Sequence, residues 1–476
     1  MKIHVRAAVL LLSALSLAAP LVSAQDRAQD KKGWLKSDTT VTDDPRRVPI
    51  PATPRGFHGT LVITGGRIFD GTGAAARAGS VVIKGNHIFA VLPEGSKDWP
   101  AEATVIDAGG KTLMPGLIDM HTHITYTEPG LPPDIGMSLS DATLRGAERL
   151  RFYLESGITS IRDVASTGDA PFRLKEWVNE GRIPGPRVFA AGQLITGTGG
   201  HAAETLSHSS PLYGSVREAS GPSDWREAVR EQFKRGADVI KIASHFSRDE
   251  VKAAIEEAHA LGLRVTCDCE TFYIQWAVEA GIDCIEHPLP RTDETIKLMA
   301  EKGVYSVPTQ IPYIYIFDLS GGYYETTSRR FTFSKEANLE LVRKMKAAGI
   351  KLGVGTDLVS NWFRYLPAPY ISELKQFVKL GYSPGEALVA ATKTNSEILD
   401  MNDKLGTLEP GKLADLIVVD GKPDSNLDDL ARIDMVIRDG LIVVRGGQVV
   451  IPRHTPETAP DAKEAAPDPS KRPFPK

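Results

Sequence analysis

Short runs of β-branched residues, separated by turn residues, mark both ends of the ordered-looking part of this chain. Three such runs, LVITGGRIF, SVVIKGNHIFAV and ATVIDAGG, lie between residues 60 and 110. The same style returns late in the chain in ADLIVVD, MVIRDGLIVV and GQVVI, where Asp439-Gly440 is a strong hairpin signal. Together they predict one small β-sandwich domain built from both chain ends, residues 59–113 and 404–453.

Between these ends, strand-like runs alternate with helix-like runs over residues 114–403. The eight strand-like runs are LIDMHTH, ITSIRDVA, PRVFAAG, DVIKIAS, LRVTCDC, CIEHP, YSVPTQ and KLGVGTD. Capping boxes at Ser247 with Glu250 and at Ser383 with Glu386 predict two helix starts. Eight such units predict an α/β fold, a TIM (β/α)8 barrel rather than a doubly wound sheet.

The N-terminus has the pattern of a secretory signal peptide over residues 1–24. Lys2 and Arg6 precede an apolar run, which ends in the small-residue pattern Val22-Ser23-Ala24. We therefore expect cleavage after Ala24, a secreted or periplasmic protein, and no stable membrane anchor after cleavage. Residues 25–58 and 454–476 are polar and rich in proline, so we interpret them as a disordered linker and tail.

Composition narrows the classes of partner. The 476-residue chain is 42% hydrophobic, which is enough for a large core and a smaller unit. Its net charge is −4 and its basic residues are scattered, so nucleic acid and anionic membrane surfaces are not expected partners. A homo-oligomer is compatible with the sequence, which does not specify the oligomeric state.

Two of the three cysteines, Cys267 and Cys269, flank Asp268 at the end of one predicted strand. An oxidising compartment would allow disulfides, but the odd number of cysteines argues against a disulfide scaffold. Residues two apart on an extended strand have Cα atoms roughly 6.6 Å apart and nearly parallel Cα–Cβ vectors. We therefore do not expect a bridge between Cys267 and Cys269.

Residues with metal-binding side chains stand at the ends of several predicted strands. His121 and His123 end the first, and because they are two apart they point to the same side. Lys241 interrupts an apolar run, His287 ends CIEHP, and Asp357 ends KLGVGTD. The carboxyl ends of barrel strands hold the chemistry of TIM barrels, and imidazoles with a carboxylate suit zinc. We predict a site for a divalent metal, Zn²⁺ above others.

Several motifs carry a family resemblance: PGLIDMHTH, IKI at Lys241, AGIDCIEH, GVGTD and the closing LGTLEPGKLADLIVVDG. With them the chain resembles the amidohydrolase superfamily of metal-dependent hydrolases from about residue 60 to about residue 450. The lysine pattern and GTGGHAAE are most similar to the branch of prolidase-like and imidazolonepropionase-related enzymes. The resemblance implies a TIM barrel with a composite β-sandwich and one or two divalent ions.

The resemblance also implies roles for single residues. His121 and His123 would bind one metal, and His287 would help to bind a second. Lys241 would bridge the two as a carbamate formed with carbon dioxide. Asp357 would bind metal and, as the catalytic residue, take the proton of the nucleophilic water.

Other residues have weaker signals. By resemblance His201, on a glycine-rich loop, contacts the carbonyl or carboxylate of the substrate; the alternative is a solvated loop histidine. Tyr313, in an aromatic-rich segment, is a candidate for substrate binding, although the segment could instead pack on the barrel mouth. His245 either faces the pocket or caps the next helix, and His259 is interpreted as structural.

The fifth predicted strand departs from the family pattern, which places a histidine ligand about twenty residues before the histidine of IEH. Counting back from His287 without gaps reaches Cys267, and a slip of one residue would select Asp268 instead. Strand alternation makes the two exclusive. We favour Cys267 as the ligand because the ungapped count also keeps Ala277 and Gly281 on their family positions, and a thiolate binds zinc well. If neither residue is a ligand, the site holds a single metal.

These features predict hydrolysis of an amide-like C–N bond in a small molecule, such as a dipeptide, an N-acyl amino acid or a cyclic amide. A metal-activated water would attack, and Asp357 would pass its proton to the leaving nitrogen. Two alternatives stay open. The same fold could hydrolyse a lactone or phosphoester, or the protein could be a non-catalytic, metal-containing binding protein.

Overall fold

The computed structural model describes residues 56–126, 138–203, 214–321, 323–325, 330–332 and 334–451. The predicted signal peptide, almost all of the predicted linker and the predicted tail lie outside these ranges. Within them, no helix has both the length and the apolar character that a membrane crossing requires.

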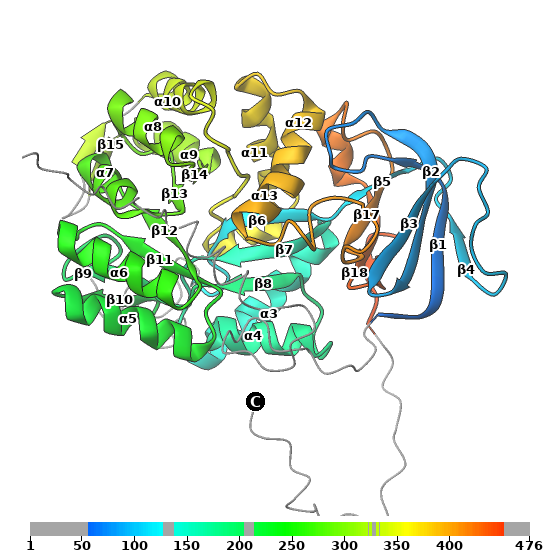
Figure 1. Cartoon of the computed structure of the whole chain (residues 1–476), viewed down its shortest axis with the longest axis horizontal. Coiled ribbons are helices and arrows are strands. Elements are labelled where there is room, and N and C mark those ends of the chain that lie inside the picture. Colours follow the sequence, from blue (N-terminus) through cyan, green and yellow to red (C-terminus); the bar gives the residue numbers. More distant parts are fainter. Residues whose placement is uncertain are drawn as a thin grey trace, which may run out of the picture.

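Strands from both chain ends form one nine-stranded sheet, drawn in blue and in orange to red in Figure 1. Its ladder runs β20-β19-β18-β17-β5-β1-β2-β3, with β4 paired to β1. The two ends meet where β5 pairs antiparallel with β17, Met114 opposite Ile417. The strands are β1 (Phe57–Ile68), β2 (Arg77–Gly85), β3 (His87–Pro93), β4 (Thr104–Asp107), β5 (Thr112–Pro115), β17 (Leu416–Val419), β18 (Ile433–Arg438), β19 (Leu441–Arg445) and β20 (Gln448–Val449).

The central region contains two parallel sheets, one ordered β6-β7-β8 and one ordered β10-β9-β11-β12-β13-β14. Seven of the eight predicted strands are confirmed, whereas β9 and β10 were not predicted. The strands are β6 (Leu117–Thr122), β7 (Ile158–Asp163), β8 (Arg187–Ala190), β9 (Leu194–Gly197), β10 (Val216–Ala219), β11 (Val239–Ala243), β12 (Arg264–Asp268), β13 (Cys284–Glu286) and β14 (Tyr305–Val307).

The eighth predicted strand, KLGVGTD, is not a regular strand but joins the two parallel sheets. A parallel bridge pairs Leu352 with Ser306 of β14, and another pairs Leu358 with Thr122 of β6. Between them, the Met120 amide donates to the Val354 carbonyl over 3.0 Å. This segment therefore brings the end of β6 next to the strands of the second sheet.

Helices lie outside the parallel strands in Figure 1. The α-helices are α3 (Leu139–Glu155), α4 (Ala170–Asn179), α5 (Pro222–Arg235), α6 (Arg248–Ala260), α7 (Thr271–Ala280), α8 (Asp293–Glu301), α9 (Gln310–Ser320), α10 (Lys335–Ala347), α11 (Ala368–Lys379), α12 (Pro384–Val389) and α13 (Asn395–Ile398). Shorter elements are the 3-10 helices η2 (Ser360–Tyr365) and η4 (Leu427–Ala431), the π-helix η3 (Ala390–Thr394), and the strand pair β15 (Tyr323–Glu325) and β16 (Arg330–Thr332).

Local sequence explains where two of these helices begin. Both predicted capping boxes are confirmed: the Ser247 and Ser383 hydroxyls accept from the third helical amide, and Glu250 and Glu386 reach back to the cap amides. In α6 the predicted apolar face, which includes Val251, is buried against the central strands. Burial of such faces positions each strand end that carries a candidate site residue.

Candidate metal centre

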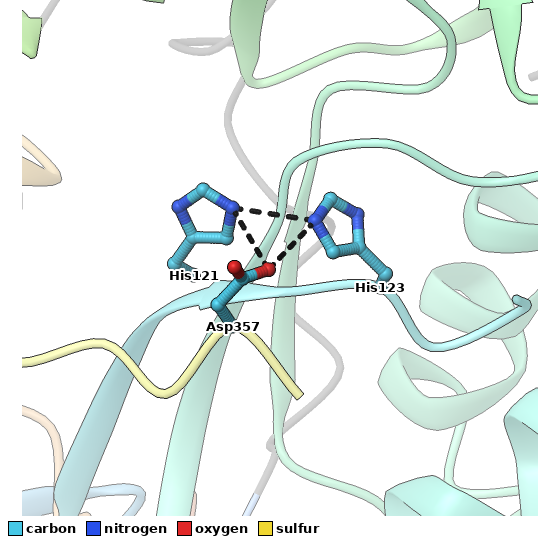
Figure 2. Close-up of side chains that lie close together, drawn as sticks. All are labelled: His121, His123 and Asp357. Carbon is cyan, nitrogen blue, oxygen red and sulfur yellow. Dashed lines mark hydrogen bonds and ion pairs between the residues drawn. The ribbon is translucent and has the colours of Figure 1, made fainter. Parts of the chain in front are cut away.

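His121 and His123 at the end of β6 point to the same side and meet Asp357, as Figure 2 shows. The Nε2 atoms of the two histidines are 3.3 Å apart. Asp357 Oδ1 lies 3.5 Å from His121 Nε2 and 3.2 Å from His123 Nε2. The Asp357 amide donates to the His121 carbonyl over 2.7 Å, which fixes the carboxylate beside the imidazoles.

The pKa shifts of His121 and Asp357 favour the protonation states that bind a cation. Burial lowers the pKa of His121 to about 3, with a further contribution from the charge of Lys241. Burial alone would raise the pKa of Asp357, but His121 and the other nearby imidazoles outweigh it and hold this pKa below its usual range. At neutral pH His121 is therefore a neutral imidazole and Asp357 an ionised carboxylate, the protonation states that metal ligands need.

A buried chain of charged groups supports His121 from behind. Glu286 Oε2 lies 2.8 Å from His121 Nδ1, so Nδ1–H donates to it and the Nε2 lone pair faces the site. Arg162 and Thr266 both donate to Glu286 Oε1. All four side chains are buried. The sequence reading did not assign Glu286 or Arg162; their signal is a charge inside an otherwise apolar strand.

Asp119 supports the other side of the group. Its Oδ1 accepts from the amides of Thr356 and His121 over 3.0 and 3.2 Å, and its Oδ2 accepts from the Thr356 hydroxyl over 2.6 Å. Asp119 thus ties β6 to the segment that carries Asp357. It too was missed from the sequence, although it is the charged residue within LIDMHTH.

A second group of polar side chains faces the first across the ends of β11, β12 and β13. His287 Nε2 lies 3.1 Å from Asp268 Oδ2, and the His121 and His287 ring centroids are 4.6 Å apart. Thr309 Oγ1 lies 2.7 Å from His287 Nδ1 and fixes that ring. The backbone at His287, Thr309 and Asp357 has positive φ, a conformation that non-glycine residues keep mainly at functional sites.

Cys267 does not belong to this second group, so the predicted ligand is wrong. Its sulfur is bonded to that of Cys269, and both fully buried side chains pack in the apolar core. The expectation that the two cysteines cannot bridge is wrong as well. Their Cα atoms are 5.5 Å apart, because β12 ends at Asp268 and its extended geometry does not continue to Cys269. The carboxylate of Asp268 enters the site instead.

The remaining candidates divide between the site and its surroundings. His201 and Tyr313 line the cavity, with His201 Nε2 3.3 Å from Asp268 Oδ2 and the Tyr313 ring 5.5 Å from the His287 ring. His245 is not among the cavity residues and its ring stacks on Tyr273. His259 pairs with Asp283 over 2.8 Å on the outer side of β12, in line with a structural role.

The first group has the donor set and spacing of a metal centre. Zinc–ligand bonds of about 2.0–2.1 Å in a tetrahedron place neighbouring ligand atoms about 3.3 Å apart. The distances around Asp357 Oδ1, 3.5 and 3.2 Å, match that edge. In the second group Asp268 Oδ2 lies 3.1 Å from His287 Nε2, and His201 Nε2 lies 3.3 Å from the same oxygen. Lys241 Nζ is buried and has no hydrogen-bond partner among the described residues. A divalent metal fits these residues.

The cavity in front of the two groups has a volume of about 200 Å³. Its polar side carries His123, His201, Lys241, Asp268, His287 and Asp357. Its other side is apolar, with Tyr126, Val164, Ala165, Leu194, Ala202, Pro312, Tyr313 and Val359. The Tyr126 ring stacks on the His123 ring at 4.4 Å, so one aromatic residue both packs on a candidate ligand and lines the cavity.

The family model described as "Amidohydrolase family" matches residues 112–443, which include every candidate ligand. The chain belongs to this family. The predicted membership and the prediction of an amidohydrolase enzyme are both confirmed. The family is metal-dependent, and His121, His123 and Asp357 form a group that could hold the ion.

Known relatives of this amidohydrolase cover most of its length. It is 28% identical over 423 residues to an ochratoxinase of Aspergillus niger, covering 81% of this chain and 86% of the relative. It is 26% identical to an imidazolonepropionase of Geobacillus kaustophilus, covering 78% and 92%. Among solved structures, a prolidase complexed with N-methylphosphonate-L-proline superposes with a TM-score of 0.72 at 29% identity, covering 81% of this chain and 100% of that one.

Proposed function

We propose that this amidohydrolase cleaves the C–N bond of a small amide, such as a dipeptide, an N-acyl amino acid or a cyclic amide. The observation that carries the proposal is the pair of facing groups, His121, His123 and Asp357 against Asp268 and His287, at one cavity. The named activities of the relatives support the bond type, since they include prolidases, an Xaa-Pro dipeptidase and an ochratoxinase.

When bound, a divalent ion, Zn²⁺ in our proposal, supplies Lewis acidity that acidifies water and polarises a carbonyl oxygen. The first group would hold one ion. Asp268 and His287 would hold a second, with Lys241 between the two. The mixture of imidazole and carboxylate donors suits zinc.

Asp357 moves the proton in this proposal. Its Oδ1 faces the imidazoles of β6, and its Oδ2 lies 3.9 Å from His287 Nδ1. Because its pKa is held low, Asp357 is ionised at neutral pH, so Oδ2 is free to accept the proton of the attacking water and to donate it to the departing nitrogen. His201, on the same polar side of the cavity, orients the substrate carbonyl.

Lys241 is suited to carboxylation. Burial lowers the pKa of its amine, which favours the neutral, nucleophilic form. That nitrogen would bond to carbon dioxide and release one proton, giving a carbamate that would add carboxylate oxygens to the residues able to hold the ions. Mass spectrometry of the native protein should find one added carbon dioxide, absent from Lys241→Met.

The cavity favours a compact substrate with an apolar part. Its apolar side offers Tyr126, Leu194 and Val359 to a small ring or branched chain, while the amide faces the polar side. Leu194→Asp should raise KM for apolar amides more than it lowers kcat, because binding to this wall is made in both ground and transition states.

We infer two further points about the whole chain. The parallel strands β6–β14 and the segment Leu352–Leu358 form a TIM barrel, and the nine-stranded sheet folds into the composite β-sandwich; the bridges at Ser306 and Thr122 and the family's solved structures support this. The protein is also exported through residues 1–24 to the periplasm or the exterior. N-terminal sequencing of the mature protein should begin after Ala24.

The test is a hydrolysis assay with metal-loaded protein on glycyl-L-proline, N-acetyl amino acids and a cyclic amide, beside a lactone and a phosphoester. Asp357→Asn should lower kcat/KM on the amides about 10²- to 10⁴-fold while it folds normally and elemental analysis still finds metal. Turnover of only the lactone or phosphoester would overturn the bond assignment. No turnover of any compound would favour a binding protein.

A further inference from the structure

The segment that departs most from the family pattern is Cys267-Asp268-Cys269. The two sulfurs are bonded to each other, so a disulfide joins the residues on either side of Asp268. Neither cysteine is exposed, and both belong to the apolar core behind the strands. The carboxylate between them points the other way, to within 3.1 Å of His287 Nε2 and 3.3 Å of His201 Nε2.

Asp268 needs such support because it stands where the strand ladder ends. On one side, Asp268 is opposite Ala243, and its carbonyl accepts from the Ser244 amide over 3.2 Å. On the other side, the pairing of β12 with β13 stops one residue earlier, at Cys267 opposite Ile285. At Asp268 the ladder with β11 is therefore still present, whereas the ladder with β13 has already ended.

The disulfide between Cys267 and Cys269 restrains the backbone of Asp268 where the strand ladder ends. It fixes the backbone on both sides of the residue, which removes conformations that would turn the carboxylate away. Both cysteines are buried in the apolar core. The bridge therefore holds the Asp268 carboxylate in a fixed position relative to that core. Without it, a residue at the last position of its strand would have more freedom than a metal ligand can have without losing affinity.

We propose that the Cys267–Cys269 disulfide is a positioning element that holds Asp268 as the ligand of the second metal position. The proposal rests on the proposed function, because it assumes that a second ion binds at Asp268 and His287. It explains why two thiols stand in a strand that needs a carboxylate: the sulfurs bind each other and not the metal.

Formation of the disulfide also depends on the redox conditions of the compartment that holds the protein. Its formation moves two electrons and two protons from the two thiols to an external disulfide, which is reduced to a dithiol. Exported proteins meet such oxidants. Alkylation of the denatured native protein, followed by mass spectrometry, should label one thiol per chain, that of Cys284, and three after reduction. Three labelled thiols without reduction would overturn the proposal.

The decisive experiment measures Zn²⁺ binding by competition with a chelator, in the wild type and in Cys267→Ala/Cys269→Ala. We expect the more weakly held ion to bind about 10- to 100-fold less tightly in the variant, as for other residues that orient metal ligands. The more tightly held ion, at His121 and His123, should be unchanged. Ile285→Val is the matched control, because Ile285 pairs with Cys267 and lies in the same apolar core. It should lose some stability and no Zn²⁺ affinity.

Asp268→Asn separates this proposal from the proposed function. If it loses the weaker ion and the double alanine variant does not, Asp268 is a ligand and the bridge does not position it. If wild type and Asp268→Asn bind the same single ion, the second metal position itself is wrong. If neither the double variant nor Cys269→Ser folds while Ile285→Val does, the bridge serves the fold and the positioning role is overturned.

Discussion

Two strands of the central region end in pairs of metal-binding residue types two apart in sequence, yet they turn opposite faces to the cavity. At the end of β6, His123 lines the cavity and His121 lies on the same side with its Nε2 3.3 Å from that of His123, while Thr122 between them accepts from the Tyr153 hydroxyl of α3, in the outer layer. In β12 the pair, Cys267 and Cys269, faces the core, and Asp268 between them faces the cavity.

The difference shows which contacts set the phase of a strand, that is, which of its alternating residues face the cavity. Period-two alternation says that residues i and i+2 share a face, but not which face. In β12 the phase follows from Thr266, which donates to the buried carboxylate of Glu286. That contact places Asp268, two residues later, in the cavity. In β6 the phase follows from Glu286 at His121 Nδ1. One glutamate thus orients both strand ends.

The largest effect should come from the β6 end. His121→Ala removes a ligand of the first ion, and loss of that ion removes several kcal/mol of transition-state stabilisation. We expect kcat/KM on the amide substrate to fall about 10³-fold or more, at about 1.4 kcal/mol per tenfold. His87→Ala, the same change at an exposed site on β3, should keep full activity. Equal activity of the two variants would contradict the role of β6.

A change at Glu286, which contacts both His121 and Thr266, should give the next largest effect. Glu286→Gln leaves the buried Arg162 guanidinium without its ionic partner and weakens the support of His121. We expect about 3 kcal/mol lower free energy of unfolding and about 10- to 100-fold weaker Zn²⁺ binding. Glu256→Gln, which breaks the half-exposed pair with Arg226, should cost at most about 1 kcal/mol and leave Zn²⁺ binding intact.

A pH dependence of stability should arise at Glu373 of α11. Glu373 accepts from the Gln310 and Ile311 amides at the start of α9, which carries Tyr313, and burial raises its pKa from 4.5 to about 8. Between these values the folded state keeps a proton that the unfolded state releases, so stability falls as pH rises.

Urea unfolding between pH 5 and pH 8 checks this sign. The wild type should lose up to a few kcal/mol of stability relative to Glu373→Gln across that range, and the two curves should run parallel above it. Stability curves that are parallel from pH 5 onward would show that Glu373 titrates normally.

A smaller effect tests the phase of β12 directly. Thr266→Val keeps the shape but removes the hydroxyl that donates to Glu286, so we expect about 2 kcal/mol lower stability and up to tenfold weaker Zn²⁺ binding. If Thr266 faced the apolar layer instead, valine would be neutral or stabilising.

Thr122→Val is the counterpart on β6, where the middle residue faces outward. It leaves the buried Tyr153 hydroxyl without its acceptor and should cost about 1 kcal/mol. Zn²⁺ binding should not change. A loss of metal affinity in this variant would mean that the two strand ends do not differ as described.

Much of the site could be predicted because it depends on where strands end. His121, His123, Lys241, His287 and Asp357 were placed by the rule that chemistry gathers at the carboxyl ends of parallel strands. The capping boxes of α6 and α12 were local signals and needed no tertiary information.

The errors concern tertiary contacts. Cys267 was chosen over Asp268 by counting residues, whereas the phase depends on Thr266 meeting Glu286 from a neighbouring strand. The bridge was rejected with the geometry of a continuous strand, but β12 ends before Cys269. KLGVGTD was taken as a regular strand and pairs only through bridges at Leu352 and Leu358.

X-ray diffraction from zinc-loaded crystals, recorded on both sides of the zinc absorption edge, tests the central claim most directly. We expect one anomalous peak bonded to His121 Nε2, His123 Nε2 and Asp357, and a second bonded to Asp268 and His287. No peak at His121 and His123, or a peak within about 2.3 Å of the Cys267 sulfur, would contradict it.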